Sequence, residues 1–197
     1  GIDNYVCVGT DRGLSIIEKY AVSNYTYNIT NYTDKEGLPS NRIRSLFVDS
    51  KGYLWVGTNK GLAILDIKSG QVLDITYILD KMGVDDKNVG AVYEDSNGNY
   101  YIGCFLHGGL IKINPDTKEY KVYRNNDDND SISNNSIRYI TEDLDGNILV
   151  GTSHGLNVLD LNTDKFIHYT ENDGLINNTV YGILVDENND IWMSTNG

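Results

Sequence analysis

Short apolar segments separated by polar turns recur along the whole chain. Between residues 43 and 77 four such segments follow one another, at 43–49, 53–58, 62–66 and 71–77. They are rich in β-branched and aromatic residues, and none shows the period of about 3.6 residues that marks an amphipathic helix. Four short strands joined by turns that contain Gly, Asp or Ser predict an antiparallel meander.

This meander is repeated along the chain. A Gly-Leu pair marks each copy, at Gly13, Gly61, Gly109 and Gly155. Further columns with the same spacing are formed by Gly9, Gly57, Gly103 and Gly151 and by Asp49, Asp95, Asp143 and Asp186. The period of about 47 residues is typical of propeller blades and solenoid repeats. Because every copy carries these Gly and Asp residues, we interpret them as residues that shape the turns and not as ligand-binding residues.

One meander of this size cannot bury both of its faces, whereas radial stacking of several meanders does. The sequence therefore predicts an all-β fold, a partial β-propeller of about four blade equivalents. We name the strands of a blade A to D from the axis outwards. The single propeller segment 1–197 then contains three whole blades, at 41–87, 88–134 and 135–177. A partial blade precedes them at 1–40 (strands B, C and D), and another follows at 178–197 (strands A and B). A ring of four blades would be tight. We expect a fragment of a longer propeller, or two chains that pair their incomplete blades.

The composition narrows the classes of partner. The chain carries 28 acidic and 16 basic side chains, a formal net charge of −12, and no basic cluster. This balance argues against nucleic acid and against contact with an anionic membrane surface. No stretch approaches the roughly 18 apolar residues of a membrane span. Cys7 and Cys104 fall in equivalent strands, so we expect small buried side chains and not a disulfide or a metal site.

Several motifs resemble one known repeat. The second copy contains GLPSN at 37–41, LWVGT at 54–58 and a Gly-Leu pair at 61–62, and GLINN recurs at 174–178. Together with the acidic column, these motifs resemble the two-component regulator propeller repeat, and the resemblance covers essentially the whole chain. Some copies depart from it: Tyr101 and Leu149 stand where the second copy has Trp55, and SISNN at 131–135 replaces GLPSN.

The resemblance implies a function in signalling. Proteins with such repeats resemble the extracytoplasmic, periplasmic or cell-surface input regions of membrane-anchored bacterial sensors. Their output modules are histidine kinases or diguanylate cyclases, and several respond to glycans. On this basis we expect the segment to be a sensing or scaffold element that is not itself an enzyme, with a carbohydrate or another small polar molecule as its ligand.

Candidate ligand-binding residues vary between the repeats but share one face of the ring. Strand direction alternates, so the B-to-C turns and the starts of the A strands lie near the same face. The candidates in the turns are Arg12, Lys60, His107 and His154, and those at the starts of the A strands are Arg44, Arg138 and Tyr181. Arg and Tyr side chains suit sugar hydroxyls or carboxylates, because they offer planar donors and a ring for stacking. The alternative interpretation is that these are ordinary exposed residues.

The third copy has a longer B-to-C turn that contains Phe105 and Leu106. An apolar insertion in an exposed turn predicts an interface with a partner chain or a neighbouring domain. Two further functions stay open: a scaffold that dimerises through its incomplete terminal blades and binds no small ligand, and a propeller lyase or hydrolase. We predict no catalytic residues, metal or cofactor, because the histidines lack an adjacent nucleophile or carboxylate pair.

Overall fold

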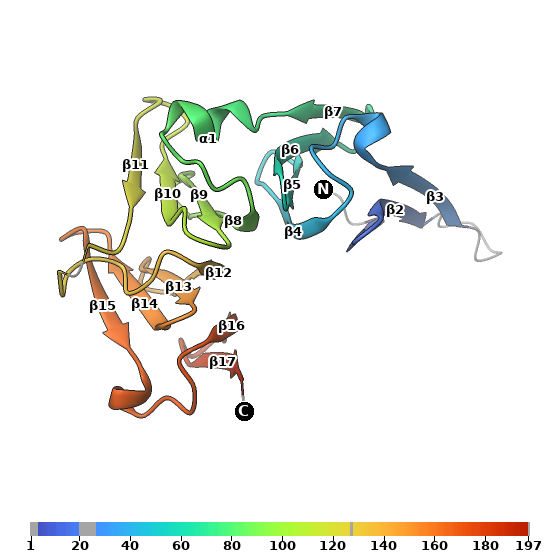
Figure 1. Cartoon of the computed structure of the whole chain (residues 1–197). Coiled ribbons are helices and arrows are strands. Elements are labelled where there is room, and N and C mark those ends of the chain that lie inside the picture. The colour runs from blue at the N-terminus through green and yellow to red at the C-terminus, as the bar shows by residue number, and fades with distance from the viewer. Residues whose placement is uncertain (1–3, 20–26, 127, 197) are drawn as a thin grey trace.

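The computed structural model describes residues 4–19, 27–126 and 128–196. Their strands form five antiparallel sheets that stand side by side around an open arc (Figure 1). The arc runs from the N-terminal sheet at the right of Figure 1 to the C-terminal sheet at the bottom. The all-β propeller fold predicted from the sequence is confirmed.

Three sheets are complete blades, and the chain runs through each in order. Blade 2 contains β4 (Ile43–Val48), β5 (Leu54–Thr58), β6 (Gly61–Asp66) and β7 (Gln71–Asp74). Blade 3 contains β8 (Val89–Glu94), β9 (Tyr100–Cys104), β10 (Leu110–Ile113) and β11 (Tyr120–Tyr123). Blade 4 contains β12 (Ile137–Glu142), β13 (Ile148–Thr152), β14 (Gly155–Asp160) and β15 (Lys165–Tyr169).

The two terminal sheets are smaller. Blade 1 contains β1 (Tyr5–Thr10), β2 (Gly13–Lys19) and β3 (Tyr27–Tyr32), and blade 5 contains β16 (Val180–Val185) and β17 (Ile191–Thr195). The innermost strands β4, β8, β12 and β16 are successive neighbours around the axis. Each second strand, such as β5 or β13, also contacts the innermost strand of the following blade. β1 contacts β4 in the same way, so β1 is the second strand of its blade.

Short helices occur only in the links between blades within the described residues. They are η1 (Asp34–Glu36), α1 (Tyr77–Lys81) and η2 (Glu171–Asp173). The sequence pattern extended a strand to residue 77, but β7 ends at Asp74 and α1 follows. The reason is burial. Ile75 and Leu79 are four residues apart, so one turn of helix turns both into the core between blades 2 and 3.

The repeated Gly and Asp residues join neighbouring blades. A Cβ at Gly57 would lie 2.7 Å from the carbonyl oxygen of Val89, so only glycine allows β8 to approach β5 this closely. Asp49 caps its turn and also accepts hydrogen bonds from Trp55 Nε1 (2.9 Å) and the Tyr100 hydroxyl (3.2 Å). The Trp55 and Tyr100 rings stack with centroids 4.6 Å apart. One carboxylate therefore ties a turn of blade 2 to a core side chain of blade 3.

Candidate functional site

Every innermost strand with a described partner carries a β-bulge near its start. The pairing register shifts between Ile43 and Ser45, Val89 and Ala91, Ile137 and Tyr139, and Val180 and Gly182. The residue left unpaired by each shift is Arg44, Gly90, Arg138 or Tyr181. A bulge bends the strand and redirects the side chain of the extra residue. The variable column found in the sequence is therefore the bulge column of the propeller.

In blade 3 the bulge residue is Gly90, which has no side chain, and Phe105 occupies the space beside it. A Cβ at residue 90 would lie 3.0 Å from Cδ2 of Phe105. The backbone of Phe105 is held on both sides: its N–H donates to the carbonyl of Asn88 (2.6 Å), and its carbonyl accepts from the hydroxyl of Ser136 (2.5 Å). Phe105 is half-buried and contacts the bulge residues, and the interface expected for Phe105 and Leu106 stays a prediction.

Asp86 shapes the turn that carries Phe105. Its Oδ2 accepts hydrogen bonds from the backbone N–H groups of Leu106 (2.9 Å), His107 (2.9 Å) and Gly108 (3.2 Å). Its Oδ1 accepts from the N–H of Asn88 (3.0 Å). Burial of Asp86 opposes ionisation, but the converging N–H donors outweigh it and hold the pKa of this carboxyl below its usual value. Asp86 is therefore a charged anchor for the turn.

Two guanidinium groups lie over the ring of Phe105. The guanidinium carbon of Arg44 is 5.2 Å from the centroid of the Phe105 ring, and that of Arg138 is 4.6 Å from it. Arg138 also lies 5.1 Å from the centroid of the Tyr181 ring. All three distances fall within the roughly 6 Å range of cation–π attraction. Arg44, Phe105, Arg138 and Tyr181 thus form one continuous group, the axial cluster, to which four blades contribute.

The cations of the axial cluster have few partners. Arg138 donates from Nε to the hydroxyl of Ser153 (3.1 Å). Nε of Arg44 is buried without a hydrogen-bond partner. Neither arginine takes part in the ion pairs of the described residues, which hold Arg42, Lys87, Lys121 and Lys165. The charges of both arginines are therefore not balanced by a carboxylate within the described residues.

The remaining predicted residues lie around the rim. Arg12, Lys60 and His154 occupy the same position in three turns, where each backbone N–H donates to a Thr hydroxyl and each side chain is exposed. His107 is exposed on the longer turn of blade 3. Leu106 beside it is 55% exposed. The structure thus brings Arg44, Arg138 and Tyr181 together with Phe105 and leaves the other candidates on separate turns.

A model of the two-component regulator propeller repeat matches residues 37–60 and 174–197. The chain carries two-component regulator propeller repeats. This confirms the family resemblance seen in the sequence. The first match contains Asp49, Trp55 and Gly57, which join blades 2 and 3 in the structure.

Known proteins with similar sequences and structures are much longer than this propeller segment. A curated relative, Histidine kinase P4 of Formosa agariphila, is 27% identical over 179 residues, which are 89% of this chain and 13% of that protein. Two solved extracellular domains from B. thetaiotaomicron have the same fold. That of the hybrid two-component system BT3049 is 22% identical, with a TM-score of 0.79, and is matched over 97% of this chain and 25% of its own. That of the one-component system BT4673 is 25% identical, with a TM-score of 0.77, over 98% and 25%.

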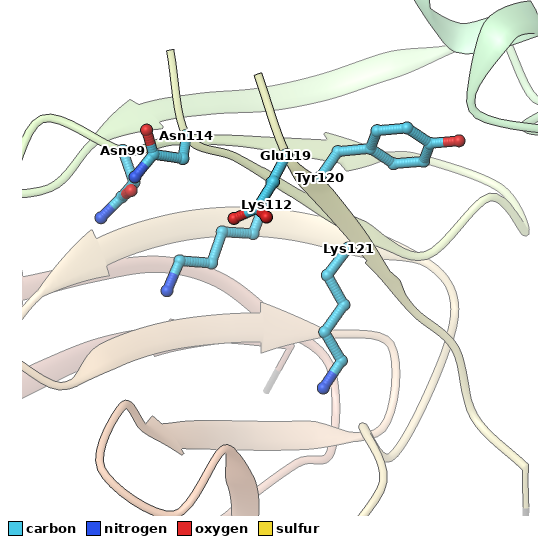
Figure 2. A pocket seen from close by; sticks show the side chains of 6 residues that line it. All are labelled: Asn99, Lys112, Asn114, Glu119, Tyr120 and Lys121. Carbon is cyan, nitrogen blue, oxygen red and sulfur yellow. The ribbon is translucent and has the colours of Figure 1, made fainter. Parts of the chain in front are cut away.

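A hollow on the surface of blade 3 was not predicted from the sequence. It measures about 470 Å³. Its lining residues are Asn99, Lys112, Asn114, Glu119, Tyr120 and Lys121 (Figure 2). Lys112 and Lys121 extend from β10 and β11 toward the next blade, where Lys121 pairs with Asp164. The sequence contained one indication of this hollow, because the charged Lys112 occupies the position that is apolar in the neighbouring repeats, Ile64 and Val158.

Two classes of feature are missing from the described parts of the chain. Residues 4–19, 27–126 and 128–196 contain no group of three or more His, Cys, Asp or Glu side chains arranged to hold a metal ion. No helix within these ranges is long and apolar enough to cross a membrane.

Proposed function

We propose that this segment is a ligand-sensing part of the extracytoplasmic input region of a bacterial two-component receptor, with the axial cluster as its binding site. The repeats, the histidine kinase relative and the similar extracellular domains support the signalling assignment. The observation that carries the site is the bulge column, since bulges in separate blades direct Arg44, Arg138 and Tyr181 to one place. Planar donors beside aromatic rings suit a polar, carbohydrate-like ligand.

The position of the cluster suggests how binding is transmitted. Four blades contribute to it, and each innermost strand packs on the next. A ligand that contacts several of these strands binds one arrangement of the blades more tightly than another. It therefore shifts the population toward that arrangement, and the change reaches whatever packs against the propeller.

A binding screen with matched variants tests this function. Isothermal titration calorimetry of the wild type against a panel of neutral and acidic oligosaccharides should identify a ligand. Arg138→Met and Tyr181→Ala should weaken its binding at least tenfold. Lys112→Met, which removes a cation from the hollow of blade 3, should leave binding unchanged. Failure of every oligosaccharide to bind, or equal loss in Lys112→Met, would argue against the axial cluster as a sensory site.

A second candidate function is an interaction scaffold without a small ligand. The observation that favours it is the apolar face of blade 5, where Leu184 is 60% and Trp192 is 63% exposed. Light scattering on a size-exclusion column separates the two functions. A dimer that dissociates in a Trp192→Ser variant supports the scaffold, whereas a 22.0 kDa monomer leaves the sensory function as the better supported one. A lyase or hydrolase has less support, because the axial cluster contains neither a carboxylate nor an imidazole that could act as a general base.

A further inference from the structure

We propose that the ligand of the axial cluster carries a carboxylate, and that it is a sugar acid and not a neutral sugar. This inference rests on the proposed sensory function and concerns the chemistry of the ligand. It follows from three features: the positive charges of Arg44 and Arg138, the lack of carboxylate partners for them in the described parts of the chain, and the contact of both with the Phe105 ring.

The first argument is the distribution of charge. The chain has a formal net charge of −12, so carboxylates are plentiful. Some exposed basic residues pair with them: Arg42 with Asp11 at 2.9 Å, and Lys165 with Asp130 at 2.6 Å. Arg44 and Arg138 form no ion pair within the described residues, although both are half-buried near the axis. Two uncompensated cations near each other repel, and a bound anion relieves that repulsion.

The second argument is the unsatisfied donor. Nε of Arg44 is buried and has no acceptor. Burial of a guanidinium group is costly unless its charge is compensated. The π face of Phe105 compensates it only in part, since cation–π attraction is weaker than a charge-assisted hydrogen bond. A carboxylate bound to the terminal nitrogens of Arg44 would supply the missing negative charge.

The third argument is preorganisation. Both guanidinium carbons lie close to one ring, that of Phe105, at 5.2 and 4.6 Å from its centroid, so one oligosaccharide is long enough to contact both arginines. Arg138 is further fixed by Ser153 and by the Tyr181 ring. Side chains that are already held lose little conformational entropy when they bind. Forked guanidinium groups match carboxylates in a bidentate geometry, whereas sugar hydroxyls do not require it. The Tyr181 ring, 45% exposed, remains available to the apolar face of a sugar.

The test compares sugars that differ only in their charge. Oligogalacturonates and oligoalginates would be titrated into the protein by calorimetry, beside the same oligosaccharides with their carboxyl groups reduced to alcohols. We expect the acidic forms to bind at least tenfold more tightly than the reduced forms. We also expect this preference to weaken steeply as salt is raised from 50 to 500 mM, about the range in which exposed charges become screened.

Variants then connect the preference to the two arginines. Arg44→Met and Arg138→Met should each remove most of the preference for the acidic form. Arg138→Lys should retain part of it, because lysine keeps the positive charge but lacks the forked guanidinium donors. Lys112→Met should keep the full preference, and thermal melts would establish that each variant is folded. Equal affinity for acidic and reduced sugars would overturn the carboxylate inference and leave the proposed function intact. Binding of neither form would overturn both.

Discussion

Phe105 covers Gly90: a Cβ added to the glycine would lie 3.0 Å from Cδ2 and 3.2 Å from Cβ of the phenylalanine. In blade 3 the side chain at this position of the axial cluster therefore comes from the turn after β9, whereas in blades 2, 4 and 5 it comes from the bulge residue itself. The absence of a side chain at residue 90 leaves room for the ring to contact both Arg44 and Arg138.

Gly90→Ala should therefore damage both the turn and the cluster. The new methyl group would also meet the carbonyl oxygen of Ile137 at 2.9 Å, a backbone atom that cannot rotate away. Overpacking of this kind costs about 1–3 kcal/mol, which urea denaturation would measure. The Phe105→Ala change provides the control. If the ring is a source of the strain, the double variant should lose less stability than the sum of the single variants. Strict additivity would contradict the contact.

Asp86→Asn should destabilise the protein at neutral pH. The change removes the negative charge of the group that accepts hydrogen bonds from the backbone N–H groups of Leu106, His107 and Gly108. We therefore expect the free energy of unfolding to fall by about 1–3 kcal/mol. Because folding lowers the pKa of Asp86, its contribution is present above the unfolded value of about 4 and is lost as the pH falls through the folded value. The difference between wild type and variant should therefore shrink below pH 4. The exposed neighbour Asp85, changed to Asn, is the matched control and should have little effect at any pH.

Two tryptophans with the same hydrogen bond should differ in their contributions to stability. Trp55 donates from Nε1 to Asp49 at 2.9 Å and is 7% exposed, while Trp192 donates to Asp186 at 3.0 Å and is 63% exposed. Trp55→Ala should cost about 3–5 kcal/mol, since it opens a cavity beside Tyr100. Trp192→Ala should cost about 1 kcal/mol or less, because most of its ring is already in water. Denaturant midpoints of the two variants measure this difference, and equal losses would mean that Trp192 is buried in solution.

The two cysteines should react with alkylating agents at different rates. Cys104 is fully buried, and burial together with the nearby Asp86 raises the pKa of its thiol to about 12. Cys7 is only half-buried, although burial raises the pKa of its thiol as well. With iodoacetamide at pH 8, peptide mapping by mass spectrometry should find Cys7 modified first and Cys104 only after unfolding. Modification of Cys104 in the folded protein would contradict its place in the core.

Much of the fold could be predicted from the sequence because one physical requirement acts in every repeat. Asp49 must cap a turn and Gly57 must admit the next strand, so the same residue types return at the same spacing. The place of Arg44, Arg138 and Tyr181 near the axis also followed from the repeat, since equivalent positions of stacked blades lie close together. The bulges that redirect their side chains did not follow, because a bulge is a property of pairing between two strands.

The parts that escaped prediction depend on contacts between distant segments. The longer turn of blade 3 was visible as an insertion, but the direction of Phe105 depends on Asp86, which belongs to the preceding link. α1 replaced a predicted strand end because Leu79 finds a core between two blades that a local pattern does not describe. The hollow lined by Lys112 and Lys121 is also bounded by Asn99 from a different turn of blade 3, so it depends on how separate segments pack.

The bulge column separates recognition from architecture. Strand pairing and the Gly and Asp columns hold the bulge in place, while the side chain of the bulge residue itself is Arg, Gly, Arg or Tyr in successive blades. The frame thus carries very different side chains at residues 44, 138 and 181, whereas residue 90 has room only for glycine. A library randomised at codons 44, 138 and 181 would sample new specificities on a constant scaffold, and natural divergence can proceed in the same way, one blade at a time.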